Sequence, residues 1–278
     1  MRPARPEFVP DPDLLRAEME SLQFDIAANA TFADDFAFDA AAVGSGDTSP
    51  ATSEPSRSDD PAQSTLGGGE APEPPLVAGV DQAFLDDRAV SAVVLLRGNE
   101  VVERAHAVEP LSIPYVPGLL SFREGGPILA AFERLEREPD LAVFDGSGRI
   151  HFRQAGLATH LGVVLDLPTV GVAKSLLCGR PREDVDGRPE GWHTPILADG
   201  DVEGPDGPLP ADEVVGYAYQ SRQYDSRAVI NPLYVSPGHR TSAGTAVELV
   251  GRLGGGYKLP EPTRLADAHA DEVKADYA

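Results

Sequence analysis

Near its N-terminus the chain shows one run of apolar residues at helical spacing. The repeat falls every three or four residues, on Leu15, Met19, Leu22 and Ile26. This spacing predicts a helix over residues 11–29, with its apolar side turned toward a core. Asp11 suits the N-cap of that helix, and Pro12 suits its first turn.

From residue 43 to residue 75 the pattern of apolar positions stops. Gly, Ser, Thr, Pro and acidic residues dominate this stretch, and large apolar residues are almost absent. Such a segment cannot bury enough surface to offset its loss of chain entropy, so we predict a disordered insertion. We therefore expect an N-terminal helical segment (1–42), the insertion (43–75), a main domain (76–270) and a C-terminal tail (271–278).

After residue 75 the apolar positions follow the spacing of strands. Three apolar runs, at 76–84, 89–96 and 101–108, are joined by short turns, which predicts an antiparallel meander. Beyond them, helical and apolar stretches alternate. The expected helices cover 121–137, 153–165 and a segment from about 241, and the expected strands cover 141–145, 168–173, 214–219 and 228–236. This order predicts an α/β fold with a ribonuclease H-like mixed sheet. In that sheet the antiparallel three-strand meander is extended by parallel strands, and helices flank both faces.

The charge of the chain bears on its partners. Acidic residues outnumber basic ones by 45 to 23, so the formal net charge is −22. Such an excess normally argues against a nucleic-acid partner, because phosphates repel it. The alternative is adaptation to very high salt, where an acidic surface keeps a protein hydrated. Because the acids are spread along the chain rather than gathered in a tail, we favour this alternative and a halophilic source.

Other compositional features indicate the cellular compartment. The single cysteine, Cys178, excludes an intramolecular disulfide and is typical of a reducing interior. No run of about 18 uncharged apolar residues occurs, and the N-terminus lacks the apolar stretch of a secretory signal. We expect a cytoplasmic, monomeric protein without a membrane partner.

Two aspartates stand in the predicted strands. Asp81 lies within the apolar run 76–84, where a carboxylate is costly to bury unless it is paired or bound to a metal; an edge-facing side chain is the alternative. Asp145 ends the strand 141–145, at the kind of position where ligand-binding groups gather, although Asp-Gly is also a common turn. In a meander-first fold the first and fourth strands are neighbours, so both aspartates could face one site. Carboxylates bind Mg²⁺ well, and phosphodiester hydrolysis uses such an ion.

Glu124 has two interpretations. Ser121 and Glu124 fit a capping box, in which the glutamate bonds back to the start of the helix; this accounts for Glu124 without any chemistry. Alternatively, Glu124 lies at the start of the helix between the meander and the fourth strand, and could overhang Asp81 and Asp145. The assembly of three acids favours the second interpretation.

Lys174 follows the predicted strand 168–173 in a chain with only three lysines. A compact charge at that place suits a phosphate, but a solvated strand-end lysine is equally compatible. The histidines His151, His160 and His239 have weaker claims, because a lone histidine is more often a hydrogen-bonded structural residue.

Tyr115 lies in a loop stiffened by two prolines, Pro114 and Pro117. A ring held outward by such a loop could fill the gap that an extruded base leaves in a stacked helix. The alternative is a turn whose tyrosine packs on the core.

Several stretches together resemble the endonuclease V family. Residues 114–124, with the sequence PYVPGLLSFRE, are similar to its wedge-and-helix signature. Four further stretches resemble the later blocks of the family in the same order: 145–160, 168–175, 231–239 and 259–267. The resemblance covers about residues 76–270.

The resemblance implies a DNA-repair endonuclease that depends on Mg²⁺, with Mn²⁺ as a possible substitute. Its substrate would be DNA containing deoxyinosine. It would hydrolyse the second phosphodiester bond 3′ to the lesion and leave a 3′-hydroxyl and a 5′-phosphate. The metal-binding and catalytic acids would be Asp81, Asp145 and Glu124, supported by Lys174 and His151. The wedge and the region that accepts the flipped base would comprise Tyr115, Pro117, Gly118, Leu119, Gly156 and Leu157.

The sequence departs from the family pattern at Gln82, Ser147 and Phe152, and in its insertion. These departures bear on substrate preference more than on catalysis, because all three acids are present. Two other functions stay open: a ribonuclease acting on inosine-containing RNA, and a non-catalytic nucleic-acid-binding module. The presence of all three acids counts against the second.

Overall fold

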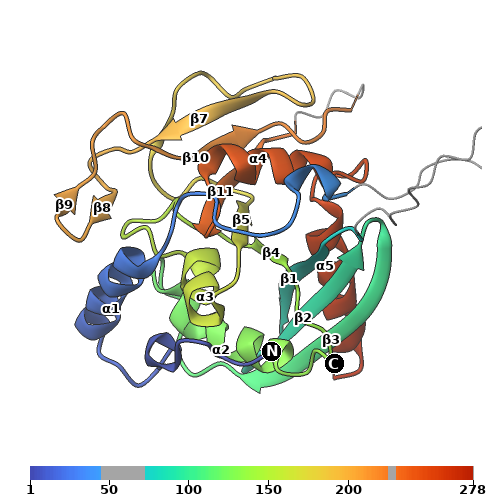
Figure 1. The fold of residues 1–278 in the computed structure, drawn as a ribbon. Helices are drawn as coiled ribbons and strands as arrows, with labels where there is room; N and C mark the ends of the chain where they lie inside the picture. Colours follow the sequence, from blue (N-terminus) through green and yellow to red (C-terminus); the bar gives the residue numbers. More distant parts are fainter. Residues whose placement is uncertain (45–72, 225–229, 278) are drawn as a thin grey trace, which may run out of the picture.

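The computed structural model describes residues 1–44, 73–224 and 230–277, so most of the predicted insertion lies outside the described residues. Within them, one large sheet has the strand order β3-β2-β1-β4-β5-β11-β10-β7-β6 (Figure 1). Its strands are β1 (Leu76–Phe84), β2 (Arg88–Arg97), β3 (Glu100–Pro110), β4 (Leu141–Asp145), β5 (Thr169–Ala173), β6 (Arg180–Pro181), β7 (His193–Leu197), β10 (Val214–Tyr219) and β11 (Leu233–His239). A separate two-stranded pair consists of β8 (Glu203–Gly204) and β9 (Gly207–Pro208).

The pairing within the sheet confirms the predicted meander and its parallel extension. β1 pairs antiparallel with β2, and β2 with β3. On its other side β1 pairs parallel with β4, and β4 pairs parallel with β5. Beyond β5 the sheet is antiparallel again through β11, β10 and β7. The short strands β6 to β9 were not predicted, and the strand expected at 228–236 begins only at Leu233.

Helices cover both faces of the sheet. One face carries α2 (Leu120–Phe132) and α3 (Leu157–Leu165), with α1 (Arg16–Asn29) outside α3 (Figure 1). The other carries α4 (Ala243–Arg252) and α5 (Glu261–Ala275). Two 3₁₀ turns, Pro6–Phe8 and Ala40–Ala42, complete the N-terminal segment.

The strand alternation assigns side chains to these two faces. Ala78 and Val80 of β1 join the apolar core under α2 and α3, whereas Val77 joins the core under α4. Ala83 packs with residues of α5. Because Asp81 has the same parity as Val77 and Ala83, its side chain leaves the sheet on the α5 side.

Three predicted helix boundaries are wrong. The first helix begins at Arg16 rather than residue 11. The Glu18 carboxylate accepts the N–H of the N-cap residue Leu15 (2.7 Å) and so caps the start of the helix there. The second ends at Phe132 rather than 137. The third begins at Leu157 rather than 153, after a loop.

The predicted C-terminal tail from residue 271 is also wrong. α5 runs without a break through residue 270 to Ala275. Ala270 and Val273 are buried against β1 and β2, so the second half of the helix belongs to the core of the domain. The acidic, alanine-rich sequence of this stretch conceals the narrow apolar stripe.

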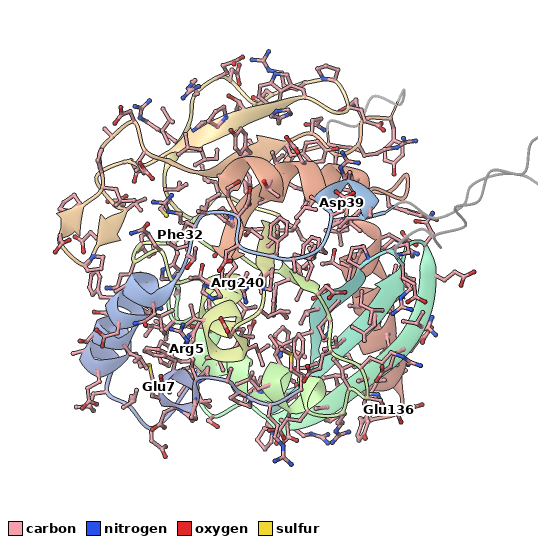
Figure 2. All side chains as sticks on the ribbon, in the orientation of Figure 1. Arg5, Glu7, Phe32, Asp39, Glu136 and Arg240 are labelled. Carbon is pink, nitrogen blue, oxygen red and sulfur yellow. The ribbon has the colours of Figure 1, made fainter. Side chains whose placement is uncertain are left out.

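The segment that follows α1 is tied to the sheet by polar contacts. Asp34 accepts the N–H of Ser242 (2.7 Å) and the hydroxyl of Thr245 (2.6 Å), and so caps α4. Figure 2 labels Phe32 and Asp39 in this segment and Arg240 beside it; Arg240 Nε donates to the Asp35 carbonyl (2.7 Å). In the described part of the chain, none of the helices is long and apolar enough to span a membrane.

Gly79 sets the close approach of α5 to β1. A Cβ at this position would overlap the backbone carbonyl of Pro262, at the start of α5. We therefore expect Gly79→Ala to lower the free energy of unfolding by about 1–3 kcal/mol, because backbone atoms must move apart. Gly126→Ala is the matched control, since a Cβ there would meet nothing within 4 Å and alanine favours a helix. Urea unfolding of both variants measures the difference; equal stabilities would show that α5 can shift freely.

Candidate active-site cleft

Two aspartates lie side by side where β1 and β4 end. The last paired residues of these parallel strands are Val80 and Phe144, so Asp81 and Asp145 each follow that pair by one residue. Both side chains leave the sheet on the α5 side. The strand register therefore brings both carboxylates to one site, as predicted from the sequence.

Asp81 is the more deeply buried of the two, at 8% exposed. One carboxylate oxygen, Oδ1, accepts the N–H of Gln82 (2.7 Å). The other, Oδ2, is buried and has no hydrogen-bond partner among the described residues. Burial, together with the charge of Asp145, raises the pKa of Asp81 to about 8. An orphaned oxygen beside a second carboxylate is a poor structural arrangement and a good one for a cation.

Lys174 supplies the nearest positive charge. It directly follows β5, and its Nζ lies 2.5 Å from Oδ2 of Asp145. Partial burial lowers the pKa of Lys174, but the hydrogen bond to Asp145 and the charges of Asp145 and Asp81 raise it overall. The lysine is therefore a cation paired with Asp145 at the edge of the aspartate pair, while its side chain stays 53% exposed to solvent.

Glu124 does not act as a helix cap. α2 begins at Leu120, so Ser121 lies inside the helix, and its hydroxyl bonds Nδ1 of His160 (2.8 Å). The capping-box interpretation is thus wrong. Glu124 is 7% exposed, and burial raises its pKa to about 7 although Arg123 Nη1, at 3.4 Å, opposes the shift. A carboxyl group that titrates near neutrality is typical of functional sites.

These acids line one open cleft of about 580 Å³, which we call the acid cleft. Its lining includes the predicted residues Asp81, Glu124, Asp145, Lys174 and Tyr115. It also includes Arg123 and Asp267, for which no chemical role was predicted. Asp267 lies on α5, and its charge contributes to raising the pKa of both Asp81 and Lys174. The close packing of α5 at Gly79 brings this acid to the site, and that contact was not visible in the sequence.

The acids do not form a closed cage. In the described residues, no three Asp, Glu, His or Cys side chains converge closely enough to enclose an ion. The predicted ligand set of Asp81, Asp145 and Glu124 is therefore not preformed as a metal site, since the Glu124 carboxylate forms an ion pair with Arg123. The aspartate pair fits a divalent cation best, because the buried Oδ2 of Asp81 is a free ligand atom and a cation would relieve the repulsion between the pair.

A smaller cavity of about 150 Å³ adjoins the acid cleft, and we call it the side cavity. The two share Tyr115, Leu120, Gly146, Leu157 and Ala173 as lining residues. Of the residues predicted to receive a base, four line the side cavity together with Tyr115: Pro117, Gly118, Gly156 and Leu157. Tyr115 is 65% exposed, so its ring does not pack on the core.

Leu119 and His151 differ from their predicted roles. Leu119 is buried beside Met19 and Phe122 and lines neither cavity. His151 lines the side cavity but not the acid cleft. Burial lowers its pKa to about 4, so the imidazole is neutral, and Nε2 lies 3.1 Å from the Gly118 carbonyl. Its geometry suits support of the Tyr115 loop rather than proton transfer at the aspartates.

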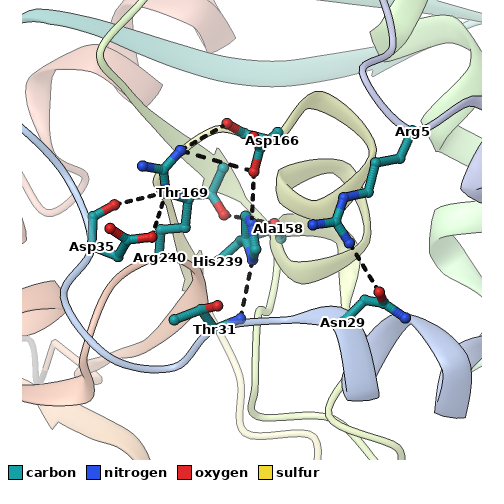
Figure 3. A network of polar contacts seen from close by, with 9 residues as sticks. All are labelled: Arg5, Asn29, Thr31, Asp35, Ala158, Asp166, Thr169, His239 and Arg240. Carbon is teal, nitrogen blue, oxygen red and sulfur yellow. Dashed lines mark hydrogen bonds and ion pairs between the residues drawn. The ribbon is translucent and has the colours of Figure 1, made fainter.

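His160 and His239 are structural, which confirms the interpretation favoured from sequence. The ring of His160 lies between the Ser121 hydroxyl and the Phe8 carbonyl (2.8 and 2.7 Å). Figure 3 shows His239 between the Thr31 N–H (3.1 Å) and Oδ1 of Asp166 (3.3 Å).

The departures from the family pattern have local explanations. Gln82 leaves β1 on the face opposite to Asp81, and its amide donates to Ser91 Oγ on β2 (2.5 Å) and to the Glu124 carbonyl on α2 (3.4 Å). The ring of Phe152 packs closely against Gly118 in the Tyr115 loop. A Cβ added to Gly118 would lie only 3.2 Å from this ring. Ser147 lines the side cavity.

Comparison with known proteins gives a consistent result. A family model described as Endonuclease V matches residues 64–268. The chain is 57% identical over 277 residues to the endonuclease V of Natronomonas pharaonis, a halophilic archaeon, covering 100% of this chain and 99% of the relative. The crystal structure of endonuclease V from Streptomyces avermitilis is 30% identical, with a TM-score of 0.69 and full coverage of both chains. The Ciona intestinalis endonuclease V, in complex with DNA containing an inosine followed by a ribo-adenosine, is 24% identical. It covers 94% of this chain and 98% of its own, with a TM-score of 0.65, and so shares the fold.

The buried charge of Asp81 should cost stability when no cation is bound. Its pKa is about 8 in the folded chain against 3.8 ordinarily, so the folded state holds a proton that the unfolded state releases between about pH 4 and pH 8. Stability is thus fully present below that window and is lost as the pH rises through it. In chelator at pH 8, we expect Asp81→Asn to raise the free energy of unfolding by at least ~1 kcal/mol, and to change it little at pH 4.

Asp87→Asn, at an exposed turn, is the control for this measurement. Denaturant unfolding between pH 4 and pH 8 measures the free energy of unfolding of both variants and of the wild type. An Asp81→Asn protein that is less stable than wild type at pH 8 would mean that the carboxylate is satisfied in the folded state.

Proposed function

This chain belongs to the endonuclease V family, and from that premise we propose that it is a divalent-metal-dependent nuclease that repairs DNA containing deoxyinosine. The observation that carries the proposal is the adjacent pair of Asp81, which is buried and has one oxygen without a partner among the described residues, and the half-buried Asp145, in a cleft continuous with the side cavity. Two neighbouring carboxylates, only one of which is paired with a lysine, suit a bound cation, and the adjoining cavity suits a base. A cytoplasmic location is part of the proposal, because the substrate is cellular DNA.

Asp81 and Asp145 would hold the ion, with Glu124 and Asp267 beside them in the same cleft. Oxygen ligands of this kind suit Mg²⁺, and Mn²⁺ binds similar sites. When bound, the ion supplies Lewis acidity at a phosphate and lowers the pKa of water.

The chain's own residues supply positioning and proton transfer. Lys174, fixed by Asp145, presents a positive charge at the mouth of the cleft to a phosphate oxygen. Glu124, with a pKa of about 7, can hold or release a proton near neutral pH, as a general acid or base must. Hydrolysis at the second phosphodiester bond 3′ to the lesion would leave a 3′-hydroxyl and a 5′-phosphate.

The side cavity would receive the extruded base, and Tyr115 would fill the place that the base leaves in the stack. Hypoxanthine differs from guanine by lacking the 2-amino group and from adenine by carrying a 6-oxo group. A tight cavity with backbone at its walls, such as Gly118 and Gly156, can exclude the amino group and donate to the oxygen. The Ciona endonuclease V bound to inosine-containing DNA supports this choice of substrate.

The cleavage assay tests the acids directly. We expect Asp81→Asn and Asp145→Asn each to reduce cleavage at least about 100-fold, because neutralising one carboxylate weakens cation binding. Glu124→Gln should lose activity as well, since glutamine cannot exchange a proton, and Asp87→Asn should keep it. The readout is the cleaved strand on a sequencing gel, with circular dichroism to confirm folding. Wild-type turnover by either aspartate variant at ordinary magnesium would overturn the site.

The substrate is tested in the same assay with matched DNA and RNA strands that contain one inosine, with and without magnesium. Cleavage of RNA alone would favour the ribonuclease. Binding that needs no divalent ion and releases no cleaved strand would favour a non-catalytic module.

Tyr115→Ala should weaken binding to an inosine-containing duplex more than binding to a single strand. A wedge helps only where an extruded base leaves a hole in a stacked helix. We expect at least a fivefold difference between the two losses, measured by fluorescence anisotropy with calcium in place of magnesium. Equal losses on both substrates would mean that the ring contacts the nucleotide in another way.

A further inference from the structure

α1 lies outside both cavities, yet it buries one polar side chain in their direction. The buried residues of this helix are Met19, Gln23, Ile26 and Ala27. Gln23 is 0% exposed and is the polar member of this otherwise apolar set. Burying an amide is costly unless both of its ends are hydrogen-bonded, so its partners reveal why it is there.

Both partners of Gln23 belong to the region of the side cavity. Its Nε2 donates to the carbonyl of Gly118, at 2.7 Å, in the Tyr115 loop. Its Oε1 accepts from Nη1 of Arg153, at 3.2 Å, two residues beyond His151. The amide therefore joins the Tyr115 loop to the segment that carries His151, which forms another part of the cavity wall.

The Gly118 carbonyl receives a second donor from that wall. Nδ1 of His151 accepts the backbone N–H of Arg153 (3.1 Å), so the proton of the neutral ring is on Nε2. Nε2 then donates to the Gly118 carbonyl (3.1 Å). Gly118 has a φ of +80°, a backbone conformation that residues other than glycine rarely adopt. Two donors from different elements thus fix one peptide in an uncommon conformation at the cavity wall.

α1 also holds Arg153 in place. Glu20 forms an ion pair with Arg153 Nη2 (3.3 Å), and the ring of Phe24 lies 5.8 Å from its guanidinium carbon. With Gln23, three residues of one helix face contact this arginine. A leucine would fill the buried site without any desolvation cost, so packing alone does not explain the glutamine.

We propose that Gln23 is a positioning residue for base recognition, which holds the Gly118 peptide and the Tyr115 loop in the arrangement that the side cavity needs. The inference rests on the proposed function, in which that cavity receives the base. A wall held in place before binding costs the substrate no ordering entropy and keeps the cavity tight enough to discriminate. Gln23 acts through the loop and does not touch the aspartates, so it affects substrate selection rather than the chemical step.

Two substitutions separate the contributions of the amide. Gln23→Leu keeps the volume and removes both hydrogen bonds. Gln23→Glu keeps the acceptor for Arg153 but faces the Gly118 carbonyl with an oxygen, which can donate only when the carboxyl is protonated. Met19→Leu is the control, because Met19 belongs to the same buried set and packs on Leu119 without a hydrogen bond.

We expect Gln23→Leu to raise KM for an inosine-containing strand roughly tenfold, the upper range for loss of one hydrogen bond, with kcat within about twofold. Its preference for inosine over guanine at the same position should fall by a similar factor. For Gln23→Glu, the increase in KM should shrink as the pH is lowered from 8 to 6, relative to wild type at each pH. Met19→Leu should match wild type in all three measurements.

Steady-state kinetics on inosine and guanine strands, with circular dichroism and thermal melts, decide the matter. Equal KM and preference in wild type and a folded Gln23→Leu would overturn the positioning role. A parallel fall in kcat and stability without a change in preference would also overturn it, because that is a purely structural effect. If Gln23→Leu does not fold, the pH dependence of Gln23→Glu decides, and a KM independent of pH counts against the proposal. A wild-type chain that cleaves no inosine strand would instead refute the proposed function itself.

Discussion

Carboxylates at the ends of neighbouring parallel strands repel each other, and burial removes the water that would weaken the repulsion. The register of β1 and β4 forces this situation on Asp81 and Asp145, and α5 adds Asp267 from the other side. Lys174 compensates only one carboxylate directly, through Oδ2 of Asp145. The fold thus holds two mutually repelling carboxylates close together, and the proposed divalent cation would relieve this repulsion. This requirement explains why rigid elements on three sides, two strands and one helix, carry the acids.

The same rigidity continues into the side cavity. Its walls come from the Tyr115 loop, the segment around His151 and the start of α3. The loop has an uncommon backbone conformation at Gly118, and such a conformation persists only where several contacts impose it. His151 and Gln23 provide those contacts from two directions. If the chain discriminates hypoxanthine from guanine, as proposed, a rigid cavity wall would favour this selectivity.

The sequence was sufficient for the part of this design that depends on local pattern. The meander, the parallel neighbours and the strand-end aspartates follow from apolar spacing, and the family and the ribonuclease H-like fold are confirmed. Failures occurred where a tertiary contact decides. Ser121 matches a cap in sequence, but its hydroxyl bonds His160 because the helix begins one residue earlier. Asp267 reaches the acid cleft only because α5 packs closely on Gly79, and Gln23 reaches the Tyr115 loop only because one face of α1 is buried. Neither contact is visible in the local sequence pattern.

A net charge of −22 and the proposed polyanionic substrate together impose one further constraint on the site. Long-range attraction cannot bring DNA to such a surface, so affinity must arise from contacts of a few ångströms, which salt screens far less. The cleft meets this condition. Two cationic side chains, those of Arg123 and Lys174, line it. With a halophilic relative of nearly equal length, the acidic surface is best understood as solvation in salt, while a few cationic side chains, the proposed metal and the proposed base cavity would provide recognition. In concentrated salt the long-range repulsion disappears and these short contacts remain.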